Sequence, residues 1–263
     1  MIHYYIITIV LCLCGVNNVQ PKEVYNDWDI LIFTQQWPAT VCNEWVHHDP
    51  SHTCVMPKQV DTWSIHGIWP TKLGTRGPLF CNRTWLFNPE EIRPIEKSLI
   101  NVWTNIEGGT EPYSLWAHEW SKHGTCAAVL ESFNSEFKYF SKGLDFLKQY
   151  NMTHILSQSG IVPNDQKKYA LIDVYNAVTN QLHVNPSIQC REGMTYLDEV
   201  RICVDKNLQL VNCDGISNHK IVDGVSIITN CHDYIYYPHF KIPPKRIYIQ
   251  LYKLVSWLQW FSL

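Results

Sequence analysis

The pattern of apolar and polar positions divides the chain into short runs typical of strands and longer segments typical of helices. Residues Trp28 to Gln36 are rich in β-branched and aromatic side chains, which indicates a strand. The run from Thr62 to Ile68 has the same character, and we expect it to end at Pro70, which has no backbone N–H to donate. Shorter strands are predicted around residue 188, at 200–204 and at 208–211.

Helical composition marks the segments 114–129, 135–149 and 166–181. A further helix is expected to begin at Asn88 and Pro89, because Asn is a favoured N-cap and Pro fits the first helical position. The order of strands and helices shows no regular β-α-β alternation. It therefore favours a single α+β domain, with a central, mainly antiparallel sheet flanked by helices.

The two ends of the chain differ in character from its body. Residues 1–20 start with an apolar, uncharged stretch that is typical of a secretory signal peptide, with a buried strand or an uncleaved anchor as alternatives. We place the folded domain at 21–245 and an apolar tail at 246–263. The tail has an apolar helical face that suits a membrane interface, but it is short for a membrane span and contains Lys253. We expect it to pack on the body, leaving no membrane span in the mature protein.

Cysteine usage supports export from the cell. Without the two cysteines of the leader, eight remain, an even number that indicates four disulfides in an exported chain: Cys42, Cys54, Cys81, Cys126, Cys190, Cys203, Cys213 and Cys231. The chain has no C-x-x-C pair, which argues against a structural zinc site. The sequons at Asn82 and Asn151 fit N-glycosylation in the secretory pathway.

Two segments carry side chains suited to acid–base chemistry. In WSIHGIWP at 63–70, His66 lies at the end of an apolar strand where it can face a cleft, although alone it would more simply be a structural histidine. On a helix, the segment HEWSKHGTC at 118–126 forms two pairs at i,i+4: His118 with Lys122, and Glu119 with His123. One helical face then carries two imidazoles, a carboxylate and an ammonium. The plainer alternative is a solvated face with ion pairs.

The sequence argues against two classes of hydrolase, the zinc metalloproteases and the serine hydrolases. The segment begins like the zinc motif H-E-x-x-H, but Lys122 stands at the second ligand position and cannot ligate while charged, so we expect no metal. No G-x-S-x-G motif of a serine hydrolase occurs. Cleavage of a phosphodiester by its own 2′-hydroxyl needs a base, an acid and positive charge at the phosphorane. Histidine serves both proton roles because its pKa lies near working pH.

The two segments together resemble the paired active-site segments of the ribonuclease T2 family, W-S-x-H-G-L-W-P and H-E-W-x-K-H-G-T-C, with Ile68 as the only change. Residues 36–38 followed by Cys42 resemble the family's opening Q-W-P…C strand, and 233–238 resemble its closing strand. The resemblance covers about 28–244 and implies the family's α+β fold. It also implies the disulfide pairing, which spacing leaves open: Cys42–Cys54, Cys81–Cys126, Cys190–Cys231 and Cys203–Cys213.

The resemblance implies an endoribonuclease that acts on single-stranded RNA with no cofactor, giving 2′,3′-cyclic phosphates and then 3′-phosphates. His123 would take the 2′-hydroxyl proton and His66 would protonate the leaving oxygen. The other matching residues would be Glu119 and Lys122 at the phosphorane, His118 at a phosphate, Trp69 stacked on a base, and Gln36 at a second base site. Some members carry a base-contacting Asp where this chain has Thr71, so no base preference is predicted.

The charge of the chain bears on its partners. The net charge of −3 argues against tight, salt-driven RNA binding at neutral pH, whereas protonation of all twelve histidines would move it toward +9. Attraction to RNA should therefore rise as the pH falls through about 6.5. We expect a secreted or lysosomal monomer that acts on RNA rather than DNA, with a glycan-mediated cell-surface receptor as a further candidate partner.

Overall fold

The computed structural model describes residues 27–216, 219–241, 254–255 and 257–260. Nine strands form one sheet: β1 Ile30–Gln36, β3 Ser64–Thr71, β5 Asn164–Ala170, β6 Ser187–Arg191, β7 Tyr196–Val204, β8 Leu210–Val211, β9 His219–Val222, β10 Val225–Thr229 and β11 Tyr234–Tyr237. The main path runs β3-β1-β7-β6-β10-β9, and only the β10–β6 and β11–β7 pairs are parallel. The predicted α+β fold with a mainly antiparallel sheet is confirmed.

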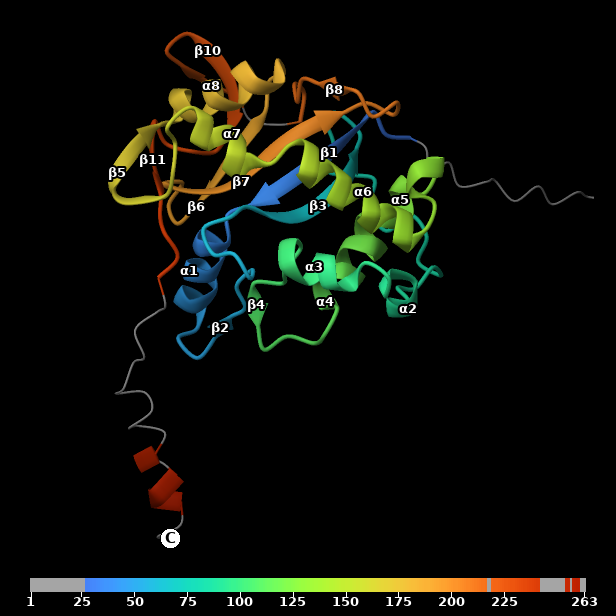
Figure 1. Ribbon diagram of the computed structural model, residues 1–263, viewed down its shortest axis with the longest axis vertical. Helices are drawn as coiled ribbons and strands as arrows, with labels where there is room; N and C mark the ends of the chain where they lie inside the picture. Colours follow the sequence, from blue (N-terminus) through green and yellow to red (C-terminus); the bar gives the residue numbers. More distant parts are fainter. Residues whose placement is uncertain (1–26, 217–218, 242–253, 256, 261–263) are drawn as a thin grey trace, which may run out of the picture.

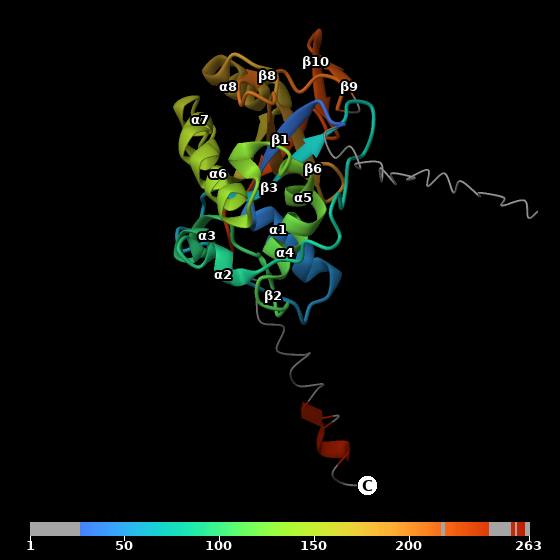
Figure 2. The same cartoon turned by 90° about the vertical axis from the view of Figure 1, so that its right-hand side faces the viewer.

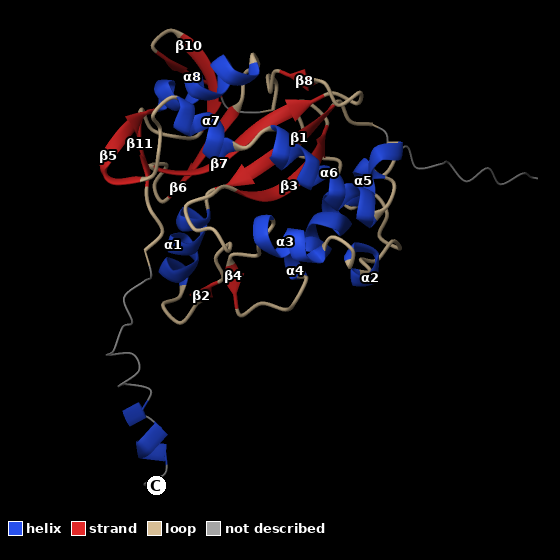
Figure 3. Cartoon of the chain, viewed as in Figure 1, coloured by secondary structure: helices blue, strands red, loops and turns tan. Residues whose placement is uncertain are grey.

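The helical elements gather around this sheet, which crosses the middle of the body in Figure 3. They are α1 Pro38–His48, α2 Pro89–Ile92, α3 Glu96–Val102, α4 Ser114–Glu119, the π-helical turn η1 Trp120–Gly124, α5 Thr125–Ala127, the 3-10 turn η2 Glu131–Phe133, α6 Glu136–Gln149, α7 Met152–Gln158 and α8 Leu171–Leu182. Helices α6 and α7 lie on the same side of β1 in both views (Figures 1 and 2). A separate two-stranded pair joins β2 (Thr53–Cys54) to β4 (Glu107–Gly108).

Strand β1 shows how the sheet separates the core from the site. Leu31 and Phe33 lie in the main hydrophobic core, where the Phe33 ring packs 5.4 Å from the ring of Phe146 on α6. Gln35 points the same way, and its amide hydrogen-bonds backbone groups at the start of α7. Because side chains alternate across a strand, Gln36 faces the opposite side, where the candidate site lies.

Several predicted elements are confirmed. Strands lie within 28–36, around 188, at 200–204 and at 210–211. The Asn88 side chain caps α2 by accepting from Glu90 N–H, and Ser135 caps α6 by accepting from Lys138 N–H.

The prediction that the second strand ends at Pro70 was wrong. Strand β3 continues through Pro70 to Thr71, with Pro70 opposite Leu31 of β1. Among the described strands, β3 is at one end of the main path, so its outer edge needs no ladder hydrogen bond from residue 70.

The predicted helix at 166–181 is also partly wrong. Its first part is strand β5, and the helix α8 begins only at Leu171. Strand β5 pairs with β11, placing Tyr169 opposite Ile235, and this distant partner overrides the local helical composition. The opening segment differs as well, since the strand ends at Gln36 and Cys42 lies on helix α1.

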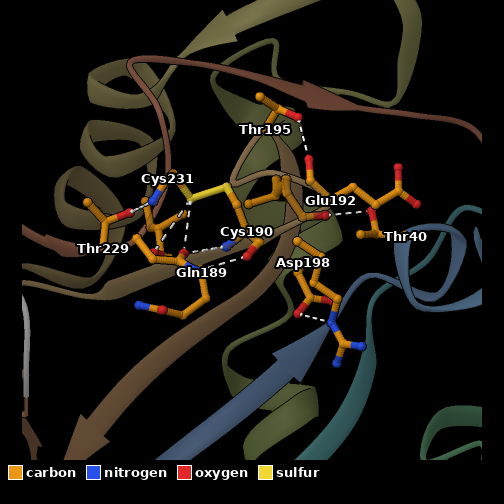
Figure 4. The surroundings of a disulfide bond; sticks show 12 residues. Thr40, Gln189, Cys190, Glu192, Thr195, Asp198, Thr229 and Cys231 are labelled. Atoms are coloured by element: carbon orange, nitrogen blue, oxygen red, sulfur yellow. Dashed lines mark hydrogen bonds and ion pairs between the residues drawn. A yellow bond between two sulfur atoms is a disulfide. The ribbon is translucent and has the colours of Figure 1, made fainter. Parts of the chain in front are cut away.

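All four disulfides implied by the resemblance are present: Cys42–Cys54, Cys81–Cys126, Cys190–Cys231 and Cys203–Cys213. Figure 4 shows Cys190 of β6 joined to Cys231 beyond β10. In the same view Asp198 of β7 lies close by, and its carboxylate accepts from the guanidinium of Arg191 at 2.6 Å.

The structure tests the predictions for the two ends of the chain only in part. The predicted signal peptide at 1–20 lies outside the described residues. In the tail, 254–255 and 257–260 are helical, and their large apolar side chains are exposed rather than packed on the body. None of the helices in the described part of the chain is long and apolar enough to cross a membrane.

Candidate active site

His66 owes its position to a β-bulge in strand β3. Thr34 of β1 pairs with Gly67 and Gln35 pairs with Ile65, which leaves His66 as the extra residue. A bulge re-aims a side chain out of the ordinary alternation. The His66 imidazole lies beside Glu119, with Nε2 4.0 Å from the Glu119 carboxylate, and its backbone carbonyl accepts from the indole N–H of Trp103 at 2.8 Å.

The second histidine segment is helical but not α-helical throughout. After α4, residues Trp120–Gly124 form a π-helical turn, in which Thr125 N–H donates to the carbonyl of Trp120 five residues back. Such turns are rare and often occur at functional sites. Glu119 and His123 are buried, whereas Lys122 is half-buried and His118 is exposed. The predicted i,i+4 contact between His118 and Lys122 is present, with Nζ 3.4 Å from His118 Nε2.

Trp69 connects the two segments. Its indole N–H donates to Glu119 Oε2 at 2.9 Å. The ring centroid of Trp69 is 5.1 Å from that of His66 and 5.4 Å from that of His123. The guanidinium of Arg201 lies 5.2 Å above the same indole. Trp69 therefore brings the two histidines and the buried carboxylate around one side chain.

A cleft of about 420 Å³ opens beside this cluster. It is lined by Gln36, His66 and His118, together with Asn105, Leu115 and Arg191. Gln36 is a buried member of this lining. Thr71, by contrast, is mostly buried, and its hydroxyl donates to the Trp69 carbonyl at 3.1 Å.

The pKa values of the two buried histidines move in opposite directions. Burial lowers the pKa of His66, but the hydrogen bond and charge of Glu199, with the charge of Glu119, outweigh it, and the pKa is raised above 6.5. Burial, followed by the charge of Lys122, holds the pKa of His123 well below 6.5. Near pH 6.5, His66 is therefore protonated while His123 is neutral.

The carboxyl and the exposed histidine are also perturbed. Burial raises the pKa of Glu119 to about 7, although His66 and the Trp69 hydrogen bond act against it. The pKa of His118 is lowered by partial desolvation and then by the Lys122 charge, which favours a neutral ring that accepts from the Lys122 ammonium. His123 Nδ1 is buried with no hydrogen-bond partner among the described residues.

Sequence reasoning missed three charged residues of strand β7 at this site: Asp198, Glu199 and Arg201. Glu199 Oε1 lies 2.6 Å from His66 Nδ1, and Arg201 holds the other carboxylate oxygen. The signal was present, because three charges in the otherwise apolar run YLDEVRICV are unusual for a buried strand. No group of His, Cys, Asp and Glu suited to a metal ion occurs in the described part of the chain.

An α+β fold that gathers two oppositely tuned imidazoles, a buried carboxyl and an ammonium beside a cleft defines an acid–base enzyme. Residues 28–213 match the model of the Ribonuclease T2 family, and the chain belongs to that family. It is therefore a ribonuclease.

Curated relatives and solved structures agree with the family. Ribonuclease Oy of Magallana gigas is 36% identical over 72% of this chain and 88% of its own length. Ribonuclease T2 of Sus scrofa is 36% identical over 84% of this chain and all of its own. The crystal structure of RNase NT in complex with 5′-AMP covers 81% of this chain and 100% of its own at 29% identity and a TM-score of 0.66. Human RNase T2 covers the same shares at 32% identity and a TM-score of 0.64.

Proposed function

We propose that this ribonuclease cleaves single-stranded RNA by attack of a ribose 2′-hydroxyl on the adjacent phosphorus, giving a 2′,3′-cyclic phosphate and then a 3′-phosphate. The observation that carries the proposal is the pair of imidazoles around Trp69, one with a raised and one with a lowered pKa. A neutral base and a protonated acid are what a transphosphorylation requires at the same pH.

In the first step, neutral His123 accepts the proton of the 2′-hydroxyl as the new O–P bond forms. Protonated His66 gives its Nε2 proton to the 5′-oxygen as the old O–P bond breaks. In the second step water takes the place of the departed alcohol, so the proton roles reverse. The rate should then be bell-shaped in pH, with its maximum between the lowered pKa of His123 and the raised pKa of His66.

Glu119, Lys122 and His118 supply the charge balance at phosphorus. The Lys122 ammonium opposes the negative charge of the phosphorane, and His118 beside it binds a phosphate oxygen. Because the pKa of Glu119 is raised to about 7, this carboxyl is protonated in mild acid and donates a hydrogen bond to the phosphorane instead of repelling it.

The bases of the RNA lie on the two sides of this centre. Trp69 stacks on one base with the part of its ring that His66, His123 and Arg201 leave open. Gln36, which lines the cleft, contacts the next base. Since the Thr71 hydroxyl is engaged by the Trp69 carbonyl, we expect little base selectivity from that residue.

We further propose secretion or lysosomal delivery, in line with the four disulfides. Asn151 is exposed, and Asn82 is half-buried beside exposed Thr84, so both are candidates for glycosylation. The expectations of a monomer and of a receptor reached through glycans stay predictions.

The test is digestion of single-stranded RNA at pH 5 to 8 with a chelator present. Wild-type protein should release cyclic phosphate ends, whereas His66→Ala and His123→Ala should be folded and lose at least about 10³-fold in turnover, as expected for loss of a general acid or base. Near-normal turnover by either variant, or inhibition by the chelator, would refute the mechanism.

A further inference from the structure

A β-bulge in β3 and the regular register of β7 on β1 turn a histidine and a carboxylate toward each other. The bulge makes His66 the extra residue of β3. In β7, Glu199 pairs with Gln36 of β1, directly after a bulge that leaves Asp198 as the extra residue opposite β6. Strand β1 lies between β3 and β7, so the His66–Glu199 contact spans the strand that ends in Gln36.

The contact is short and enclosed. His66 Nδ1 lies 2.6 Å from Glu199 Oε1, and Glu199 is only 3% exposed. The other carboxylate oxygen of Glu199 accepts from Arg201 Nε at 2.9 Å and Nη2 at 2.5 Å. Burial disfavours the charged form of Glu199, but Arg201 and His66 outweigh it and hold its pKa below the usual value. Glu199 is therefore an ionised carboxylate inside the protein.

We propose that Glu199 is a positioning residue for the ribonuclease reaction, which holds His66 in the Nδ1–H form, keeps it protonated in the resting enzyme, and leaves Nε2 to transfer the proton. The inference rests on the proposed function, in which His66 is the acid of the first step. It adds a carboxylate–histidine pair that the two histidine segments do not contain.

The proton count follows from the two ring nitrogens. Before cleavage both nitrogens of His66 carry protons, with Nδ1–H donating to Glu199. The Nε2 proton passes to the leaving 5′-oxygen as the O–P bond breaks, and Nδ1 keeps its proton. The product is a neutral imidazole still bonded to Glu199, so the ring does not have to turn before it accepts a proton from water in the second step.

Arg201 connects the His66–Glu199 pair to the other residues of the site. Its guanidinium binds Glu199 and lies over the ring of Trp69, whose N–H binds Glu119. Glu119 in turn lies 4.0 Å from His66 Nε2. Other charged or titratable groups that act on this region are Asp198 of β7, His118 of α4, and Lys122 and His123 of η1. The Glu199 carboxylate is the only one of these described groups that hydrogen-bonds Nδ1.

The test is the pH dependence of kcat/KM for Glu199→Gln. Glutamine keeps an oxygen for the Nδ1 proton but removes the charge, so the pKa of His66 should fall by about one unit or more. The alkaline limb of the profile then moves to lower pH, and turnover at pH 7.5 falls about tenfold while turnover at pH 5 falls less than about threefold. Glu199→Asp keeps the negative charge and should therefore move the alkaline limb part of the way back to its wild-type position.

Glu44→Gln is the matched control, because Glu44 is also a carboxylate held by an arginine, Arg191 at 2.6 Å. Its alkaline limb should coincide with that of the wild type. An unchanged limb in folded Glu199→Gln, or a loss that is uniform across pH, would overturn the positioning role. Full turnover by His66→Ala would instead refute the proposed function itself, so the two failures are distinguishable.

If Glu199→Gln does not fold, because it leaves the Arg201 guanidinium unpaired, a measurement on the wild-type protein still tests the inference. Ring-nitrogen NMR of the histidines, assigned with His66→Ala, should show neutral His66 protonated at Nδ1 and a pKa above 6.5. A neutral form protonated at Nε2, or a pKa at or below 6.5, would contradict the inference without any variant at position 199.

Discussion

The side chains of Glu119 and Trp69 lie directly against the backbone at Gly67, which makes Gly67→Ala the most decisive perturbation of the site. A Cβ at this position would lie 2.0 Å from Glu119 Oε2 and 2.3 Å from Trp69 Nε1, where ordinary van der Waals contact begins near 3.4 Å. Both atoms would have to move by more than about 1 Å, and the 2.9 Å hydrogen bond between them would be lost. A displacement of about 1 Å in a catalytic group costs roughly 10²-fold in rate.

We therefore expect Gly67→Ala to lower kcat/KM about 100-fold on single-stranded RNA. The overpacking itself should cost about 2 kcal/mol, or roughly 6 °C in Tm, because flexible side chains rather than backbone meet the new methyl group. Steady-state kinetics and thermal unfolding separate the two effects.

Gly77→Ala, in the loop that follows β3, is the matched control, since its Cβ would meet only Leu79 N at 3.5 Å. It should retain near-normal turnover. Wild-type kcat/KM in Gly67→Ala, or an equal loss of activity in Gly77→Ala, would contradict this prediction.

Three further predictions concern other parts of the network. Trp69→Phe removes the N–H that binds Glu119, so the pKa of Glu119 should rise further and this carboxyl should stay protonated to higher pH; in the pH–rate profile the ratio of kcat/KM at pH 7 to kcat/KM at pH 5 should then be larger than in the wild type. Burial raises the pKa of Glu136 to about 7, so the folded protein holds this proton more tightly than the unfolded chain does. As the pH rises from 4.5 to 7, the free energy of unfolding of the wild type should therefore fall on the order of 2 kcal/mol relative to that of Glu136→Gln. Denaturant titrations measure both, and parallel pH curves for the two proteins would contradict this. Replacing Cys81 and Cys126 together with serine opens a 45-residue loop, and calorimetry should show a loss of about 4 kcal/mol.

Local patterns predicted the parts of the fold that depend on local interactions. The strand at β1 and the capped helix at α6 follow from residue type and from the Ser135 cap, which lie within the segments themselves. Strand β5 was missed because its hydrogen-bond partner, β11, lies more than 60 residues away. No periodicity within 166–181 contains that information.

The same distinction explains the site. The two histidine segments were visible because each keeps its chemistry within nine residues, so the sequence pointed to His66, Glu119 and His123. The π-helical turn and the two bulges were not visible, since each depends on register between strands or on packing of a whole helix. Glu199 is 133 residues from His66, and the bulge of β3 together with the register of β7 on β1 places Glu199 Oε1 2.6 Å from His66 Nδ1. Under the proposed function, the local sequence identifies His66 as the acid, but sheet register sets the surroundings that raise its pKa, and a one-residue slip of β7 would turn Glu199 away from His66.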